Sequence, residues 1–257
     1  MSMTLNGKRA LVAGGSSGIG AATARLFAAN GAHVAVVASS DKSKAQTVVD
    51  EIATAGGTAQ AFAADISQTG EVDRLVGEVA AALGGIDILV NAAGVFYPTP
   101  TGETPEADYD RMMDLNLKGA FYMIGAVVPH MKSAGGGKIV NISSVAGSMG
   151  LGGYAVYCAA KAGVDMMTRA LAIELAPHDI NVNAIAPGNT ATPMNEDIRT
   201  DPEFKPFLDA MAANTPATRI YSTPEDMAGI ALLLASDAGR ALHGSIILAD
   251  EGFSAGM

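Results

Sequence analysis

Short apolar runs alternate with longer amphipathic segments along most of the chain. Runs typical of buried parallel strands cover residues 9–13, 33–38, 58–64, 86–90, 138–142, 180–186 and 245–249. Segments with helical spacing lie between them at 19–30, 42–55, about 67–83, 105–131, 154–175 and 223–235, with a shorter one near 203–213. Ser67 or Thr69 is the expected cap of the third helix. The alternation predicts an α/β fold, a doubly wound Rossmann-type parallel sheet of about seven strands with helices on both faces.

The chain reads as a single domain over residues 1–257, because no linker, repeat or low-complexity segment divides it. Apolar residues make up 49% of the sequence, which is enough for a sizeable buried core. One long excursion from the predicted sheet covers about 188–223 and is rich in Pro, Thr and Asn. Long excursions in compact domains often serve as lids or binding loops, so we expect this one to border the site.

The acidic charge balance argues against partners that carry negative charge. The formal net charge is −10, and no basic cluster interrupts the acidic surface, which argues against a nucleic acid or a membrane as partner. No apolar run reaches the length of a membrane span, and the N-terminus lacks the apolar core of a leader. With Cys158 as the single cysteine, we expect a cytoplasmic protein. The four histidines show no metal-ligand spacing, so no metal is expected.

A glycine-rich turn joins the first predicted strand to the first predicted helix. Glycines there let the backbone turn tightly and approach a pyrophosphate, while the helix N-terminus offers free N–H groups to the phosphates. The spacing is G-x-x-x-G-x-G rather than G-x-G-x-x-G, but its position between a strand and a helix is the expected one. We predict a dinucleotide site that includes Gly14, Ser16, Ser17, Gly18, Ile19 and Gly20.

The end of the second strand bears on the choice of cofactor. An acidic side chain there would bind the ribose 2′-hydroxyl of NAD and repel a 2′-phosphate. This chain instead has Ser39 and Ser40, with Lys42 close behind. Asp41 is also near and no arginine is present. The sequence therefore favours NADP(H) and leaves NAD(H) as the alternative.

A tyrosine stands four residues before a lysine in the helix predicted over 154–175, so Tyr157 and Lys161 share one helix face. The ordinary pKa of a phenol is about 10, and a neighbouring ammonium lowers it. Ser144 stands 13 positions before Tyr157, after the strand over 138–142. Taken alone, this spacing is most often an ordinary helix surface. In chemical terms, the three groups could hold an alcohol or carbonyl oxygen and exchange a proton with it.

Several pieces appear in a fixed order: Gly14-x-x-x-Gly18-Ile19-Gly20, Asp65, Asn91-Ala92-Ala93-Gly94, Asn116, Ser144, Tyr157-x-x-x-Lys161 and Pro187-Gly188-x-Thr190-x-Thr192. Together they resemble the short-chain dehydrogenase/reductase family over essentially the whole chain. Two small departures are Ala92, where the family more often has asparagine, and Ala13, where it usually has threonine.

The resemblance implies an enzyme that moves a hydride between NAD(P)(H) and a secondary alcohol or ketone, acting on CH–OH groups. Tyr157 would be the general acid/base, and Lys161 would lower its pKa and bind the nicotinamide ribose. Ser144, rather than the adjacent Ser143, would orient the substrate oxygen, and Asn116 would hold a water that links Lys161 to solvent.

The resemblance also implies cofactor contacts beyond the glycine turn. Asp65 would bind the adenine amino group, the 91–94 segment would pass beneath the adenosine ribose, and residues 187–192 would bind the nicotinamide carboxamide. The expected contacts are Asp65, Ile66, Asn91, Ala92, Ala93, Gly94, Tyr157, Lys161, Pro187, Gly188, Thr190 and Thr192.

The substrate pocket is expected to be mostly apolar, which suits a small-molecule alcohol or ketone with hydrophobic parts. Its expected lining includes Ser144, Val145, the stretch from Met149 to Tyr154 and Met194. Further members are the 95–100 loop with Val95, Phe96 and Tyr97, and Leu208 and Met211 from the loop after Thr192. Two alternatives stay open: a 3-oxoacyl-carrier-protein reductase, and a nicotinamide-cofactor sensor without turnover. The first would need a basic patch, and Lys118, Lys132, Arg199, Lys205 and Arg219 are dispersed along the sequence.

A homotetramer or homodimer is expected. The helices over 105–131 and 154–175 carry apolar residues on more than one face, including Met112, Met113, Met166 and Met167. The resemblance implies that such helices pair across a two-fold axis. The apolar tail 252–257 is a candidate contact with a neighbouring subunit.

Overall fold

The computed structural model describes residues 3–255, in which seven strands form one parallel sheet. The strands are β1 (Arg9–Ala13), β2 (His33–Ala38), β3 (Thr58–Ala63), β4 (Ile88–Asn91), β5 (Gly137–Ile142), β6 (Ile180–Pro187) and β7 (Ile246–Ala249). Their order across the sheet is β3-β2-β1-β4-β5-β6-β7, so the winding reverses between β1 and β4. This confirms the predicted doubly wound fold, and a ligand crevice is expected at the carboxyl ends of these two strands.

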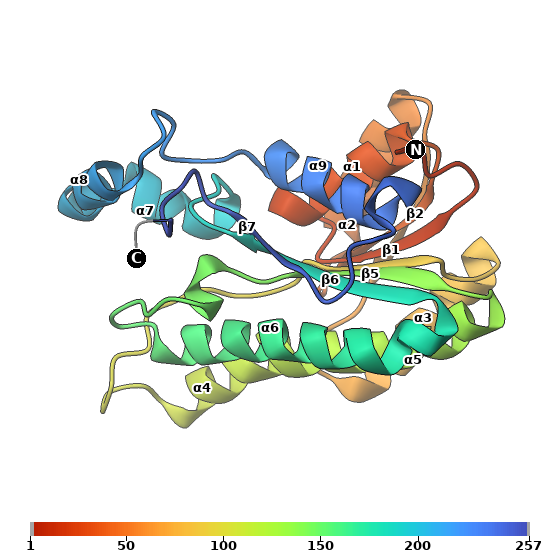
Figure 1. Ribbon diagram of the computed structural model, residues 1–257, viewed down its shortest axis with the longest axis horizontal. Helices are drawn as coiled ribbons and strands as arrows, with labels where there is room; N and C mark the ends of the chain where they lie inside the picture. Colours follow the sequence, from red (N-terminus) through yellow and green to blue (C-terminus); the bar gives the residue numbers. More distant parts are fainter. Residues whose placement is uncertain (1–2, 256–257) are drawn as a thin grey trace.

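Helices cover both faces of the sheet (Figure 1). One face carries α1 (Gly18–Ala29), α2 (Lys42–Thr54) and α9 (Pro224–Ala235). The other carries α3 (Thr69–Leu83), α5 (Gly119–Ser133) and α6 (Ala155–Leu175). No helix within residues 3–255 is long and apolar enough to cross a membrane.

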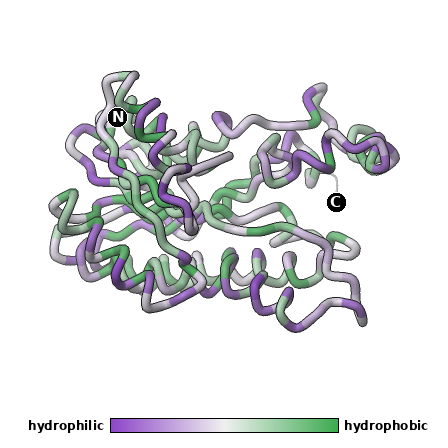
Figure 2. Tube along the Cα trace, turned by 180° about the vertical axis from the view of Figure 1, so that it is seen from behind, coloured by the Kyte–Doolittle hydropathy of each residue, from purple (hydrophilic) through white to green (hydrophobic). Residues whose placement is uncertain are grey.

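Each face of the sheet has its own hydrophobic core, because successive strand side chains point to opposite faces. Val12 and Val36 enter the core beneath α1 and α9, whereas Leu11 and Ala35 enter the core beneath α3 and α5. Buried parallel strands therefore read as continuous apolar runs, and the hydrophobic colour gathers in the central strands (Figure 2).

The helix expected over 105–131 is interrupted. It consists of α4 (Glu106–Met113), a π-helical turn (Asp114–Lys118) and α5. Within the turn, the Asn116 amide donates to the carbonyl oxygens of Met112 and Val95, both at 3.0 Å, and accepts from the Val95 N–H at 3.2 Å. A side chain that bonds the backbone in this way widens one helical turn, a feature often found at functional sites.

The excursion over 188–223 contains two helices. The helix expected near 203–213 is α8 (Lys205–Asn214), and it is preceded by α7 (Glu196–Thr200), which the sequence did not predict. Both lie together at the end of the molecule away from the N-terminus (Figure 1). The excursion ends at α9, where the Thr223 side chain accepts from the Asp226 N–H, as the predicted cap requires.

Candidate active site

A cavity of about 710 Å³ opens at the carboxyl ends of the central strands. Its floor is the glycine turn after β1, and its walls come from the ends of β2 to β6, from α4 and α6, and from the excursion. It therefore spans the point where the strand order reverses, as expected for this fold. Most of the predicted site residues line this one cavity, and Lys42 and Asn91 do not.

The glycine turn is shaped by close backbone contacts. Gly14 has φ +76°, and a Cβ there would lie 2.6 Å from the Ala93 backbone nitrogen. A Cβ on Gly20 would collide with the Gly14 carbonyl oxygen. The turn leads into α1, whose first turn holds no acidic residue and whose N-cap Ser17 makes no side-chain cap bond. Free N–H groups therefore face the cavity at the positive end of a helix.

Of the cofactor contacts predicted at the end of β2, two line the cavity and one does not. Ser39 and Ser40 line the cavity and are exposed. Asp41 is the N-cap of α2, and its carboxylate accepts the Ser43 N–H at 2.9 Å. Lys42 is the first residue of that helix and does not line the cavity, so its expected cofactor contact stays a prediction.

Asp65 lies at the end of β3 and lines the cavity together with Ile66. Its Oδ1 accepts from the Ser67 N–H at 3.0 Å and from the Ser67 hydroxyl at 2.7 Å. Ser67 is therefore occupied, and the N-cap of α3 is Gln68 rather than Ser67 or Thr69 as predicted. The carboxylate is held at the cavity rim by its own neighbour.

Two predicted asparagines bond other parts of the protein, and their roles toward ligand and water stay predictions. Asn91 is buried, and its Nδ2 donates to Asn141 Oδ1 at 2.9 Å, which joins β4 to β5 instead of lining the cavity. Asn116 lines the cavity, but its amide is engaged by the backbone of Val95 and Met112. Gly94 fits beside Asn116 because a Cβ there would lie 2.5 Å from Asn116 Oδ1 and 3.9 Å from Lys161 Nζ.

Tyr157, Lys161 and Ser144 meet at the inner end of the cavity. Lys161 Nζ lies 5.6 Å from the centre of the Tyr157 ring and donates to the Ile142 carbonyl at 2.9 Å. Burial raises the pKa of Tyr157 to about 12, against the lowering effect of a hydrogen bond with Ser144. In the protein alone, burial dominates this pKa, and a lowering of it by Lys161 stays a prediction. Burial also lowers the pKa of Lys161 to about 8.

The segment after β6 supplies an unpaired polar atom. Thr190 is 5% exposed, and its Oγ1 is buried with no hydrogen-bond partner within residues 3–255. Thr192 begins a short capping box with Asn195, whose Nδ2 donates to the Thr190 carbonyl at 3.0 Å. A buried hydroxyl without a partner is costly unless a ligand supplies one. This hydroxyl, the tight glycine turn and the open α1 N-terminus together fit a dinucleotide with a terminal amide.

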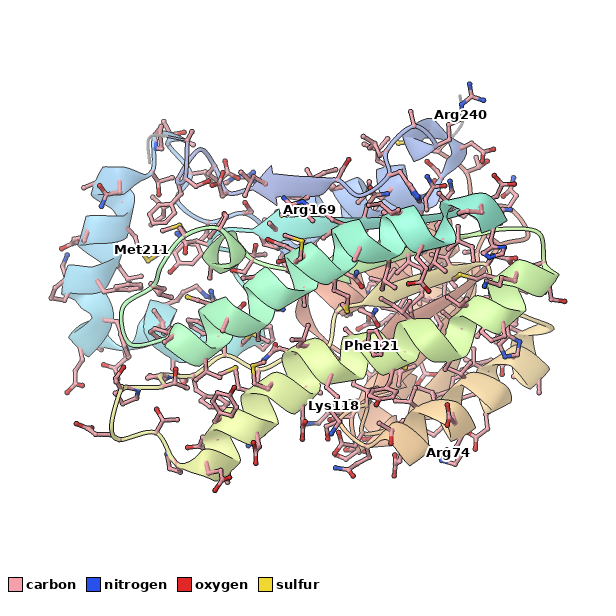
Figure 3. All side chains as sticks on the ribbon, turned by 60° about the horizontal axis from the view of Figure 1, so that its bottom comes forward. Arg74, Lys118, Phe121, Arg169, Met211 and Arg240 are labelled. Atoms are coloured by element: carbon pink, nitrogen blue, oxygen red, sulfur yellow. The ribbon has the colours of Figure 1, made fainter. Side chains whose placement is uncertain are left out.

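The opposite wall of the cavity is aromatic. Phe96 stacks on Tyr154 with ring centroids 4.5 Å apart and 7° between planes. The other predicted pocket residues Val145, Met149 and Met194 also line the cavity, as does Met211, which α8 turns toward the rest of the domain (Figure 3). Leu151, within the predicted stretch 149–154, lines it too, and the sequence did not single out several further lining residues: Arg111, Leu115, Ile198, Phe207, Tyr221 and Phe253.

Four further predictions, two on the lining of the pocket and two on assembly contacts, differ from the structure. Tyr97 donates its hydroxyl to the Asp108 carbonyl and does not line the cavity, and neither does Leu208. Met112 is fully buried and cannot form part of an assembly surface. Phe253, in the tail expected to reach a neighbour, lines this chain's own cavity. Residues 256 and 257 of that tail lie outside the described residues.

Known proteins resemble this chain over nearly its full length. The family described as Enoyl-(Acyl carrier protein) reductase matches residues 13–254. The 3beta-hydroxysteroid dehydrogenase 1 of Eggerthella lenta is 38% identical over 251 residues, which is 97% of this chain and 95% of that protein. A 3-oxoacyl-acyl-carrier-protein reductase of Synechocystis sp. is 40% identical over 92% of each chain. A solved gluconate 5-dehydrogenase of Burkholderia cenocepacia, in complex with NADP and tartrate, has a TM-score of 0.92 at 32% identity, covering 98% of this chain and 97% of that one.

These relatives differ in substrate but share one chemistry, so fold, cavity and likeness together define an oxidoreductase that uses a nicotinamide cofactor and acts on CH–OH groups. Within that class, the chain belongs to the short-chain dehydrogenase/reductase family. Because a steroid, an acyl carrier and a sugar acid all appear in the relatives' names, membership leaves the substrate to be argued from the cavity.

Proposed function

We propose that this enzyme interconverts a secondary alcohol and its ketone, with Tyr157 exchanging the proton with the substrate oxygen. The observation that carries the proposal is that Ser144, the buried Tyr157 and the buried Lys161 line one wall of the same cavity. Two hydroxyl groups that meet in this way offer one substrate oxygen two partners, one to orient it and one to exchange its proton.

Before cofactor binds, the raised pKa of Tyr157 favours donation of its proton to the substrate oxygen. Because burial raises the pKa of Tyr157 to about 12, its phenol is protonated at neutral pH and can donate to a ketone oxygen. Lys161, on the same helix face, would stabilise the phenolate and hold the cofactor ribose. Asn116 would act by holding the 95 loop and the π-helical turn beside Lys161, with the water relay still to be tested. The chemistry that a bound nicotinamide ring supplies is hydride transfer.

NADP(H) is the cofactor we propose. The gluconate dehydrogenase that resembles this chain was solved with NADP. In this chain Ser39 and Ser40 border the cavity, and the nearby Asp41 carboxylate accepts the Ser43 N–H to cap α2. An acid that is already engaged repels a 2′-phosphate less than one that points into the site. Asp65 and Ile66 would hold the adenine end, and Thr190 and Thr192 the carboxamide.

The proposed substrate is an uncharged alicyclic or aryl-substituted secondary alcohol. Its pocket would be lined by Ser144, Val145, Met149, Tyr154 and Met194, together with the wall formed by Phe96. Aromatic faces and methionines favour flat apolar groups and adapt to their outline. Within residues 3–255 the charged side chains that line the cavity are Asp65, Arg111 and Lys161. The first belongs to the proposed adenine end and the last to the proton exchange.

A panel of alcohols tests this proposal. Purified enzyme with NADP⁺ or NAD⁺ is given substituted cyclohexanols, hydroxysteroids, polyols and sugar acids, and nicotinamide absorbance is followed. We expect the cyclic apolar alcohols to have the highest kcat/KM, with NADP⁺ preferred. Sugar acids that surpass them would contradict the substrate class and point to Arg111 as a carboxylate partner.

Two alternatives are answered by the same assay. A carrier-protein reductase would need a cluster of free basic side chains near the cavity mouth. Lys118, Lys205 and Arg219 are each paired with an acid, and Arg111 is the one arginine that lines the cavity within residues 3–255. A 3-oxoacyl substrate on the carrier should therefore react no faster than the free thioester. A cofactor sensor would bind NADPH and turn over none of the panel.

We also propose a homotetramer or homodimer that works in the cytoplasm. Support for assembly comes from exposed apolar side chains on α5 and α6: Phe121 is 51% exposed, Met166 60% and Ile173 80%. Phe121 stands on the outer side of α5, in front of the sheet (Figure 3). Burying such residues in a second copy would remove them from water.

A further inference from the structure

The inner face of α6 is tied to β5 and the loop after it by polar side chains. Thr168 Oγ1 accepts from Asn141 Nδ2 at 3.0 Å, and Lys161 donates to the Ile142 carbonyl at 2.9 Å. The Ser143 hydroxyl donates to the Lys161 carbonyl at 3.3 Å. Three consecutive residues at the end of β5 therefore set the position of the helix that carries Tyr157.

Asp165 lies on the same buried face of α6, and the proposed mechanism does not use it. It is 6% exposed, one helical turn after Lys161, and its Oδ1 is buried with no hydrogen-bond partner within residues 3–255. Its Oδ2 lies 2.6 Å from the point that a Cβ on Gly147 would occupy. The carboxylate is therefore enclosed between the catalytic helix and the turn that follows Ser144.

A buried carboxylate is costly to retain unless a nearby cation or donor stabilises it. The charged and titratable groups around Lys161 on its own helix are Tyr157 and Asp165, and Asp165 in turn faces Arg169. From the other elements come the neutral groups Ser143, at the end of β5, and Asn116, in the π-helical turn. Asp165 is thus the acidic group nearest to the buried ammonium on this helix, and it attracts that ammonium without a direct ion pair.

We propose that Asp165 is a positioning residue for the reaction: its carboxylate keeps Lys161 charged and holds the Ser143–Gly147 turn against α6, so that Ser144 stays in reach of Tyr157. This inference rests on the proposed function for its consequence in turnover. The arrangement itself rests on the burial of Asp165, its unpartnered oxygen and the close approach of Gly147. Attraction by Asp165 also opposes the lowering of the Lys161 pKa by burial.

The decisive variant is Asp165→Asn, which keeps the shape and removes the charge. Its matched control is Thr168→Val, one turn further on the same face, which removes a bond to β5 and no charge. Binding of NADPH is titrated from pH 6 to 10 by the fluorescence of NADPH itself, which is convenient because the chain has no Trp. The pH profile of ketone reduction and the thermal midpoint are measured beside it.

We expect affinity and turnover of Asp165→Asn to begin falling about 1 pH unit lower than in the wild type, because Lys161 loses its proton earlier. Turnover at pH 8 should drop about fivefold, because the protonated fraction of Lys161 falls from about one half to about one eleventh when its pKa moves from about 8 to about 7. Thr168→Val should lower the thermal midpoint and leave both pH profiles in place. Asp165→Glu, which restores the charge, should return the profile toward the wild type if the longer side chain is accommodated.

The proposal is overturned if Asp165→Asn keeps the wild-type pH profile, or if Thr168→Val shifts it equally, since either result assigns Asp165 a purely structural role. Gly147→Ala provides a second route, because its Cβ would displace the carboxylate without altering a charge. It should lower turnover and shift the pH profile in the same direction as Asp165→Asn, by a smaller amount. If the wild type turns over no alcohol, the proposed function fails, while the NADPH titration still decides the role of Asp165.

Discussion

Phe96 meets the Tyr157 ring edge to face, with centroids 4.9 Å apart and 74° between the planes. The same phenylalanine stacks flat on Tyr154. Edge-to-face pairs have a preferred geometry that does not depend on the phenol hydroxyl. The Tyr157 ring is therefore held by packing, and removal of its hydroxyl should leave the cavity wall in place.

Tyr157→Phe should for this reason separate chemistry from binding. Turnover should fall by about 10³-fold or more, the loss of a proton-exchanging group, while NADPH binding stays within a few-fold of the wild type. Steady-state kinetics and a cofactor titration check both parts. Tyr97→Phe is the control, because that hydroxyl bonds the Asp108 carbonyl outside the cavity. Turnover of Tyr157→Phe near that of the control would remove Tyr157 from the mechanism.

Cofactor preference should reverse when an acid is placed at the end of β2. Ser39→Asp adds a carboxylate that lines the cavity, where it would repel a 2′-phosphate and bind a ribose hydroxyl. We expect kcat/KM with NADP⁺ to fall about 100-fold, near the 2.7 kcal/mol that a pair of like charges at close range costs. NAD⁺ kinetics should be unchanged or better. Ser43→Asp, on α2, should alter neither value, and equal losses with both cofactors would contradict this account.

Lys161 should leave a signature in the pH dependence of stability. Its pKa is about 8 when folded, below the ordinary value of 10.5, so between these values the unfolded chain binds the extra proton. The free energy of unfolding should therefore rise with pH from 8 to about 10, by up to about 1.4 kcal/mol per unit. Urea denaturation of the wild type and Lys161→Met at several pH values measures the difference. A difference that stays flat or falls over this range would contradict the lowered pKa.

An ion pair with a structural role lies at the amino ends of the central strands, away from the cavity. Arg9 Nε and Nη2 contact the two carboxylate oxygens of Asp87 at 2.7 and 2.6 Å, which joins β1 to the start of β4. Asp87→Asn should cost about 2 kcal/mol, more than a surface pair contributes. Asp209→Asn, which breaks the exposed pair with Lys205, should cost less than about 0.5 kcal/mol. Chemical denaturation of both variants compares the two, and equal losses would argue against this ranking.

Assembly is tested by a charge on the exposed face of α6. Ile173→Glu changes the most exposed large apolar residue in residues 3–255 and should shift sedimentation toward a smaller species. Met3→Glu is the control, since Met3 is 47% exposed at the other end of the chain. A wild type that sediments as a monomer would contradict the proposed oligomer, and an unshifted Ile173→Glu would place its interface elsewhere.

Sequence reasoning reached the fold and most of the cavity lining because backbone geometry dictates particular residues there. Only glycine tolerates the conformation of Gly14 and the approach of Ala93, so the motif reports the turn directly. The same reasoning failed where a side chain bonds the backbone. Asn116 widens a helical turn although the apolar periodicity around it continues. The amide side chain at a buried position of that pattern was the one feature of the sequence that could have indicated the interruption.

The remaining differences concern long-range contacts that local patterns do not encode. Lys42 follows the second strand in sequence, yet the capping of α2 by Asp41 directs it into the helix rather than the cavity. The pKa of Tyr157 depends on the packing of Phe96, Met112 and Ala146 around it, which the Tyr-x-x-x-Lys spacing cannot report. Burial outweighs the neighbouring ammonium in this case.

The bonds between Asn116 and Val95 give the cavity one rigid side. They fix the 95 loop, and with it the stacked faces of Phe96 and Tyr154, to the helix behind it. The facing side is built from α7 and α8, which stand out from the sheet as a separate pair (Figure 1). Selectivity for molecular outline should accordingly evolve on the fixed aromatic wall, while changes in α7 and α8 should alter how fast ligands enter and leave.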